Sequence, residues 1–167
     1  KIFLTGNPVR QEIYSANAKR DKAYEFFNLD KNRKTLLVVG GSLGARSINE
    51  CINGQLQKLI DSNVQLIWQT GKGYYPIAQE TVNRVNRNDL LAFEFIKQMD
   101  YAYAAADVVV SRAGAIAVSE ITVVNRPALL VPLPTATEDH QTKNAISLVN
   151  HNAAILIADK DANLKLV

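Results

Sequence analysis

The sequence alternates short apolar runs with segments in which apolar residues recur every three or four positions. The apolar runs predict six strands, over residues 35–39, 64–68, 90–93, 108–111, 128–131 and 153–157. Most of these runs lack polar alternation, which is typical of strands buried on both faces of a sheet.

The segments between the runs predict helices. The longest apolar stripe predicts one helix over 45–59 and consists of Ala45, Ile48, Ile52, Leu56 and Leu59. Shorter helices are expected over 74–85, 99–106, 116–124 and 141–149, the first being the weakest because Pro76 lies near its start. Strand and helix alternating in this way indicate a doubly wound, Rossmann-like parallel α/β sheet with helices on both faces. Such sheets bind ligands at the carboxyl ends of their strands.

Length and composition limit the class of protein. The chain has 167 residues, of which 47% are hydrophobic and 21% charged, as expected for one folded domain and too apolar for disorder. The single Cys51 cannot form an internal disulfide and is expected to be a buried thiol on the 45–59 stripe. No run approaches a membrane span, and no signal peptide is evident. Because Lys1 rather than Met opens the chain, we expect a fragment or a processed form.

The net charge of +3 is too small to indicate a nucleic-acid-binding surface. The charge is uneven, however, because residues 1–34 hold eight basic and four acidic residues. This excess is compatible with a solvated helical face, or with a surface that meets anions or an anionic membrane.

Two glycine-containing segments follow predicted strands. GGSLGAR, residues 40–46, follows the 35–39 strand, where glycines let a backbone approach a phosphate or simply fit a tight turn. The spacing fits neither a dinucleotide fingerprint nor a Walker loop. SRAGAIAVSE, residues 111–120, follows the 108–111 strand, so the amides of Ala115 and Ile116 after Gly114 are expected to face an anion. Glu120, about a turn and a half into that helix, is placed to accept both hydroxyls of a ribose.

Two further segments carry polar side chains. In PLPTATEDHQTKN, residues 132–144, Asp139 is a candidate helix cap, and His140, Gln141 and Asn144 suit sugar hydroxyls. His140 lacks the neighbours of a zinc ligand, and no metal site is predicted. TGNPVR, residues 5–10, is either a turn into a helix or a segment whose Arg10 meets a phosphate or a uracil carbonyl.

These four segments, in this order and spacing, resemble the carboxy-terminal half of the MurG glycosyltransferases, over nearly the whole chain. The resemblance implies one half of a GT-B architecture, in which the carboxy-terminal domain binds UDP-N-acetylglucosamine. It implies transfer of N-acetylglucosamine to lipid I, giving lipid II for peptidoglycan synthesis, without a metal or another cofactor. It also implies peripheral contact with the cytoplasmic face of the bacterial inner membrane.

The resemblance assigns a role to each site position. Arg10 and Ile96 would flank the uracil. Ser42 and the amides near Ala115 would hold the diphosphate. Glu120 would take the ribose. The sugar-contacting positions would be His140, Gln141 and Asn144. The complete set of substrate-binding positions is Arg10, Ser42, Ile96, Arg112, Gly114, Ala115, Ile116, Glu120, His140, Gln141 and Asn144.

Three positions depart from the family pattern. Leu43 stands where glutamine is common, Ala117 where a hydroxyl residue is common, and His140 where glutamine is frequent. The Ala117 change removes a side-chain donor but leaves its main-chain N–H. The His140 change puts one sugar contact in question.

We expect the whole of residues 1–167 to be one UDP-sugar-binding domain, with the amino-terminal acceptor domain and the final helix absent. Such a chain should bind donor without transferring sugar by itself, and measurable transfer to a lipid I analogue would contradict this. Two alternatives remain at this stage. One is a GT-B-type UDP-N-acetylglucosamine epimerase, which would need further carboxylates, and the other is a non-catalytic nucleotide-sugar-binding module. An oxidoreductase is more distant, since its glycine fingerprint is missing.

Overall fold

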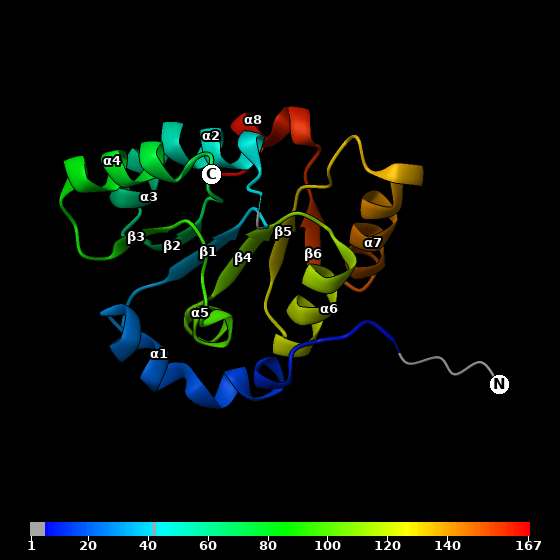
Figure 1. The fold of residues 1–167 in the computed structure, drawn as a ribbon, viewed down its shortest axis with the longest axis horizontal. Helices are drawn as coiled ribbons and strands as arrows, with labels where there is room; N and C mark the ends of the chain where they lie inside the picture. The colour runs from blue at the N-terminus through cyan, green and yellow to red at the C-terminus, as the bar shows by residue number, and fades with distance from the viewer. Residues whose placement is uncertain (1–5, 42) are drawn as a thin grey trace.

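The computed structural model describes residues 6–41 and 43–167 and contains a six-stranded, wholly parallel sheet. The strand order is β3-β2-β1-β4-β5-β6, the order of a doubly wound dinucleotide-binding fold (Figure 1). The strands are β1 (Thr35–Val39), β2 (Gln65–Gln69), β3 (Leu90–Phe93), β4 (Val108–Ser111), β5 (Ala128–Leu130) and β6 (Ala154–Leu156). The predicted fold class is confirmed, and all six strands lie within one residue of their expected limits.

Helices cover both faces of the sheet. The lower layer in Figure 1 contains η1 (Gln11–Lys19), α1 (Arg20–Phe27), α5 (Met99–Ala105) and α6 (Ala115–Val124), with α7 (His140–Val149) beside it. The upper layer contains α2 (Arg46–Gly54), α3 (Leu56–Asp61), α4 (Tyr75–Val85) and α8 (Ala162–Lys165). Two short 3-10 turns, η2 (Thr137–Asp139) and η3 (Asp159–Asp161), precede α7 and α8.

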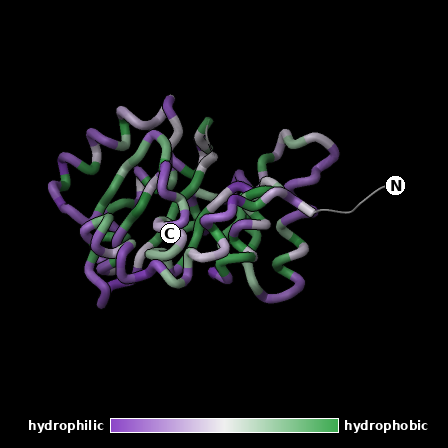
Figure 2. The backbone as a smooth tube through the Cα atoms, turned by 60° about the horizontal axis from the view of Figure 1, so that its bottom comes forward, coloured by the Kyte–Doolittle hydropathy of each residue, from purple (hydrophilic) through white to green (hydrophobic). Residues whose placement is uncertain are grey.

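Each central strand contributes to two separate cores, which explains its continuous apolar sequence. In β1, Leu37 and Val39 pack under the lower helices, whereas Leu36 and Val38 pack under the upper ones. In the hydropathy view of Figure 2, the strands are largely green and the outer turns largely purple.

The helix predicted over 45–59 is two helices, because the chain leaves helical geometry at Gln55 (φ −114°, ψ 14°), directly after Gly54. Glycine is a poor residue for a helix interior. The apolar stripe is nevertheless continuous, since Ile48, Ile52 and Leu56 all enter the upper core. Cys51 is buried as predicted, and its thiol donates to the Ala162 carbonyl.

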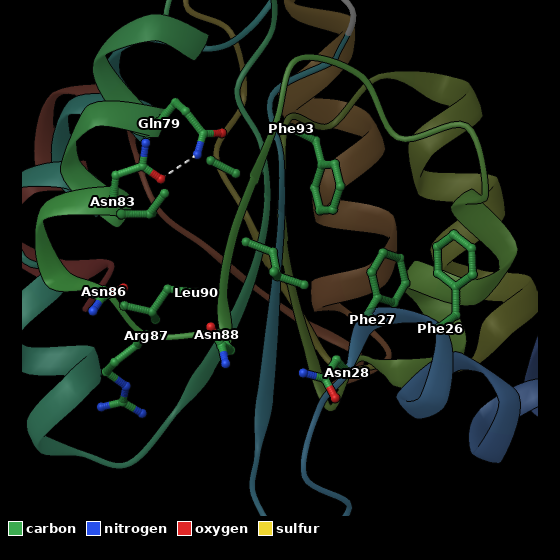
Figure 3. Close-up of a pocket in the computed structure, with 13 residues that line it drawn as sticks. Phe26, Phe27, Asn28, Gln79, Asn83, Asn86, Arg87, Asn88, Leu90 and Phe93 are labelled. Atoms are coloured by element: carbon green, nitrogen blue, oxygen red, sulfur yellow. Dashed lines mark hydrogen bonds between the residues drawn. The ribbon is translucent and has the colours of Figure 1, made fainter.

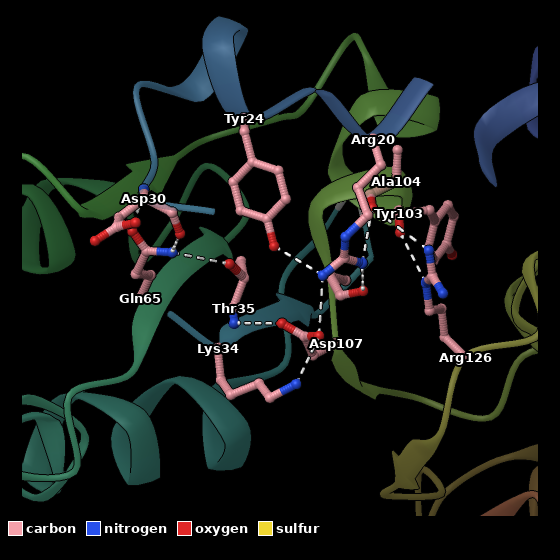
Figure 4. Close-up of polar contacts among 11 residues, drawn as sticks. Arg20, Tyr24, Asp30, Lys34, Thr35, Gln65, Tyr103, Ala104, Asp107 and Arg126 are labelled. Carbon is pink, nitrogen blue, oxygen red and sulfur yellow. Dashed lines mark hydrogen bonds and ion pairs between the residues drawn. The ribbon is translucent and has the colours of Figure 1, made fainter. Parts of the chain in front are cut away.

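The basic excess of the first 34 residues is largely matched by acids elsewhere in the fold. Six of the eight basic residues form ion pairs: Arg10, Lys19, Arg20, Lys31, Arg33 and Lys34. Figure 4 shows part of this network, where Arg20 and Lys34 both meet Asp107 at the amino end of β4. The hypothesis of a free anion-binding surface in this region is therefore not supported.

Candidate functional site

Three loops that follow neighbouring strands meet at the carboxyl end of the sheet: 40–45 after β1, 112–114 after β4, and 131–136 after β5. Side chains join them directly. Arg112 donates to Ser47 at the start of α2, and Asn144 of α7 donates to the Ala113 carbonyl at 3.1 Å. The predicted meeting of the three segments at one edge is thus present in the fold.

The glycines of the first loop serve the packing of its backbone. A Cβ on Gly44, which has φ +82°, would lie 2.3 Å from the Thr70 carbonyl oxygen, and one on Gly71 would lie 2.4 Å from the Gly44 nitrogen. A Cβ on Gly40 would lie 2.6 Å from the Ala45 nitrogen. The steric interpretation of these glycines therefore holds at Gly40 and Gly44. Ser42, predicted to contact the diphosphate, lies outside the described residues.

Gly114, at the N-cap of α6, differs from those glycines. Its φ of −64° suits any residue, and a Cβ there would meet nothing within 4 Å. No side chain caps α6, and its first residues Ala115 and Ile116 are exposed. The first amides of a helix have no partner within the helix, so this end offers main-chain donors and the positive end of a dipole to solvent.

Glu120 lies further along α6 and is 4% exposed. Its carboxylate accepts from Arg10 through Nε at 3.0 Å and through Nη2, and it accepts from the Tyr103 hydroxyl at 3.2 Å. Burial and the neighbouring Glu120 charge raise the pKa of Tyr103 well above its ordinary value, so the phenol remains a hydrogen-bond donor. The Arg10 side chain is 40% exposed, which makes it the mobile member of this trio.

Sequence reasoning missed Tyr103, which is 2% exposed on α5. The signal available was weak, because an aromatic residue in the alanine-rich stretch 102–106 is expected as ordinary core. Only the packing of α5 beside α6 reveals that its hydroxyl meets a carboxylate.

Arg112 was predicted to bind substrate, but its guanidinium is used inside the protein. It donates to the carbonyls of Val131 and Pro132 at 3.1 and 3.3 Å, to the Ser47 hydroxyl, and to Asp159 in an ion pair. The side chain is only 15% exposed. Arg112 therefore ties together the loops after β4, β5 and β6 and the start of α2, and a ligand contact is not apparent.

Ile96 was predicted to flank a uracil, yet its side chain is 2% exposed and lies in the lower core. Its main-chain N–H donates to the side chain of Gln69 at 2.9 Å, and Gln69 also donates to the Gly41 carbonyl. A ligand would therefore reach the main chain of this loop rather than the Ile96 side chain. The neighbouring Phe95 is 54% exposed.

The sugar-contacting candidates lie at the start of α7. His140 is exposed and contacts the Thr137 carbonyl through Nδ1, and Gln141 accepts from the Leu133 N–H at 3.0 Å. Asp139 occupies the N-cap position with φ +56°, but its carboxylate accepts from the Thr142 hydroxyl instead of a helix amide. The prediction of a side-chain cap at Asp139 is therefore wrong.

Neither a metal site nor a membrane-spanning helix is found in the part of the chain that the structure describes. Within residues 6–41 and 43–167, no three His, Cys, Asp or Glu side chains are grouped to hold a metal ion. Over the same ranges, every helix is too short or too polar to cross a bilayer.

Comparison with known proteins identifies the family. The family model described as "Glycosyltransferase family 28 C-terminal domain" matches residues 35–167. The chain belongs to this family. The family 28 domain described here is 52% identical over its whole length to the UDP-N-acetylglucosamine–N-acetylmuramyl-(pentapeptide) pyrophosphoryl-undecaprenol N-acetylglucosamine transferase of Parabacteroides distasonis. It spans 45% of that protein, so it covers about half the length of such relatives.

Solved structures agree with this assignment. The crystal structure of MurG from Acinetobacter baumannii superposes with a TM-score of 0.71 and 32% identity, covering 95% of this family 28 domain and 44% of that chain. WaaG, a glycosyltransferase of lipopolysaccharide biosynthesis, superposes with a TM-score of 0.64 at 18% identity over 96% of this chain and 45% of its own, which supports the fold alone. The predicted resemblance to the MurG carboxy-terminal half is confirmed.

Proposed function

We propose that this chain is the donor-binding domain of a glycosyltransferase that moves N-acetylglucosamine from UDP-N-acetylglucosamine to lipid I. One observation carries the proposal. The open, uncapped start of α6 at Gly114 and the buried carboxylate of Glu120 lie on the same helix. This is the spacing that a nucleoside diphosphate needs between its phosphates and its ribose. The transferase named above, which is 52% identical to this chain, supplies the sugar and the acceptor.

The diphosphate would sit at the start of α6. Free amides at Ala115 and Ile116 face the place where a phosphate would bind, and the absence of a Cβ at Gly114 leaves room for it. Ala117 retains its main-chain N–H despite lacking a hydroxyl. As the bond to the sugar breaks, these donors would stabilise the charge that develops on the departing UDP, without a metal.

The ribose would bind Glu120 in exchange for Arg10. A carboxylate has about four acceptor positions, and Arg10 and Tyr103 already use most of those on Glu120. Two ribose hydroxyls therefore need Arg10 to withdraw, after which its guanidinium is free to meet the uracil or a phosphate. Tyr103 would stay in place and hold the carboxylate in orientation.

The base and the sugar would lie on either side of the ribose and diphosphate. The uracil would meet the main chain at Ile96, and the N-acetylglucosamine would meet Gln141 and Asn144, with His140 alongside. Arg112 would act by positioning the loops rather than by touching the donor. The acceptor domain of a GT-B transferase, lipid I binding and peripheral contact with the inner membrane would belong to the half of the relatives that this chain does not span.

Ligand-dependent thermal unfolding tests the proposal. The chain is heated with UDP-N-acetylglucosamine, UDP-galactose, UDP or NAD at increasing concentration. Ligand at about 100 times its Kd adds about 2.7 kcal/mol of stability, so the unfolding temperature should rise with UDP and further with UDP-N-acetylglucosamine. Glu120→Gln is the matched variant, since it keeps the shape of the side chain and should reduce the shift. A shift with NAD alone, or none with any uridine ligand, contradicts the proposal.

A further inference from the structure

The open edge of the sheet at β3 lies far from the proposed donor site and is hollowed by a groove of about 770 Å³. Figure 3 looks into this groove. One wall is α4, with Gln79 and Asn83, and the other is the end of α1, with Phe26 and Phe27. The strand itself forms the floor. Unlike the central strands, β3 has a neighbour on one side only.

The hydrogen-bond register shows which main-chain groups of this strand are unused by the sheet. The carbonyls of Asp89 and Phe93 accept from Leu66 and Thr70 of the β2 side, each at 2.9 Å. Since a trans peptide group directs its C=O and N–H in opposite directions, the N–H groups that follow those carbonyls point away from β2. The same alternation along the parallel ladder turns the Ala92 N–H and C=O and the Leu90 C=O outward.

This set of groups is complementary to itself. In an antiparallel pair, two opposing residues can exchange both N–H···O=C bonds. If Ala92 opposes Ala92 of a second copy, each donates to the other across a two-fold axis. The outward N–H of Glu94 then faces the outward C=O of Leu90 in the second copy, and the reverse. The Leu90 N–H needs no partner, because it donates to the Arg87 carbonyl of its own turn at 3.4 Å.

The side chains around the strand also suit a second copy. Uncharged amides, which are both donors and acceptors, dominate the polar lining: Asn28, Gln79, Asn83, Asn86 and Asn88. The charged lining residue Arg87 is matched by its own Asp89, with contacts of 2.9 and 2.6 Å. A copy of this surface therefore meets no unmatched like charge. Phe26, 52% exposed at the rim, adds apolar area.

We propose that the β3 edge, defined as Leu90–Phe93 with its α1 and α4 walls, is a self-association surface. Two copies join their sheets by antiparallel pairing of β3 about a two-fold axis at Ala92. Such a contact is isologous and closes after two copies. It also covers the exposed strand edge, which would otherwise be a site of uncontrolled pairing. The proposal does not depend on which ligand the carboxyl edge binds.

Sedimentation equilibrium of the chain at increasing concentration tests this proposal. The wild type should show a monomer–dimer equilibrium. Ala92→Pro removes the outward N–H without removing a bond to β2, so it should leave the chain monomeric with an unchanged circular dichroism spectrum. Ala154→Pro is the matched control on β6 at the opposite edge, where the register also turns residue 154 outward, and it should dimerise like the wild type.

A second pair of variants keeps the test decisive if proline disturbs the strand. Asn83 lies between Gln79 and Asn86 on the α4 wall, so two copies of it approach each other in the proposed dimer. Asn83→Asp and Asn83→Lys should each be monomeric, and their mixture should associate. A monomeric wild type at its highest soluble concentration would overturn the proposal. So would a dimer that Ala154→Pro abolishes and the β3-edge variants leave intact, since that dimer would use β6.

Discussion

The two ends of the same sheet treat their polar groups in opposite ways. At the amino end, side chains satisfy one another: Asp107 accepts from the Thr35 N–H and from Arg20, and the Gln65 amide bonds to Asp30 through both its oxygen and its nitrogen (Figure 4). At the carboxyl end, α6 begins without a capping side chain. The amino end is therefore closed by its own side chains, and the carboxyl end presents unbonded donors. A ligand can add hydrogen bonds at the second end and would have to break them at the first.

Glycine substitutions should show this difference most strongly. Gly44→Ala places a Cβ against the Thr70 carbonyl in a backbone with φ +82°, so we expect a loss of at least about 3 kcal/mol in the free energy of unfolding. Gly114→Ala meets neither obstacle and should leave stability unchanged or slightly higher. It should instead weaken UDP binding at least tenfold, about 1.4 kcal/mol, because the methyl group enters the phosphate position.

Urea denaturation and UDP titration of the two variants separate the two roles. If Gly114→Ala destabilises the fold as much as Gly44→Ala does, Gly114 is a packing residue and the comparison fails. If both variants bind UDP like the wild type, the start of α6 does not hold the diphosphate.

The fold was predictable from sequence because its information is local. The run from Thr35 to Val39 states by composition that it is buried on both faces, and Gly40 states where it ends. The break at Gln55 was not predictable from the apolar stripe, because the stripe continues across it. Only backbone geometry shows that two short helices share one buried face.

The candidate site was predictable in its position but less so in its contacts. The rule that ligands bind at the carboxyl ends of strands places Gly114 and Glu120 at the same edge. It does not show that Arg112 spends its guanidinium on carbonyls and Asp159, since those partners lie 19, 20 and 47 residues away. Nor does it show that the Ile96 side chain is core. Long-range contacts of this kind exist only once the chain has folded.

Breaking the closed end should have a smaller effect, and one that depends on pH. Burial opposes the charge on Asp107, but the Thr35 N–H, Arg20 and Lys34 outweigh it and lower its pKa. Its stabilising contribution is therefore complete above the unfolded value of about 3.9 and is lost as the pH falls through the lower folded value. Asp107→Asn should cost about 2 kcal/mol at neutral pH, and the difference from wild type should shrink in acid.

Urea denaturation across this pH range checks the expectation. Asp21→Asn is the matched control, because Asp21 pairs with Lys31 on the exposed surface and its side chain is 82% exposed. Exposed pairs contribute little, so this variant should resemble the wild type. Equal effects of the two substitutions would mean that the amino-end network carries no special share of the stability.

The smallest expected effect tests whether the open end also relies on a fixed side chain. Tyr103→Phe removes the hydroxyl that donates to Glu120 at 3.2 Å and leaves the ring in the core. Glu120 should then be held by Arg10 alone, the partner that ribose binding displaces. We expect UDP affinity to fall about fivefold, or roughly 1 kcal/mol, measured by isothermal titration calorimetry. The 2′,3′-dideoxy analogue of UDP should bind wild type and variant equally, because it makes no hydrogen bond to the carboxylate. A loss of equal size with both ligands would assign Tyr103 to general packing. A selective loss would show that the ribose depends on an oriented carboxylate, and that the open end, too, contains one element fixed in advance by the fold.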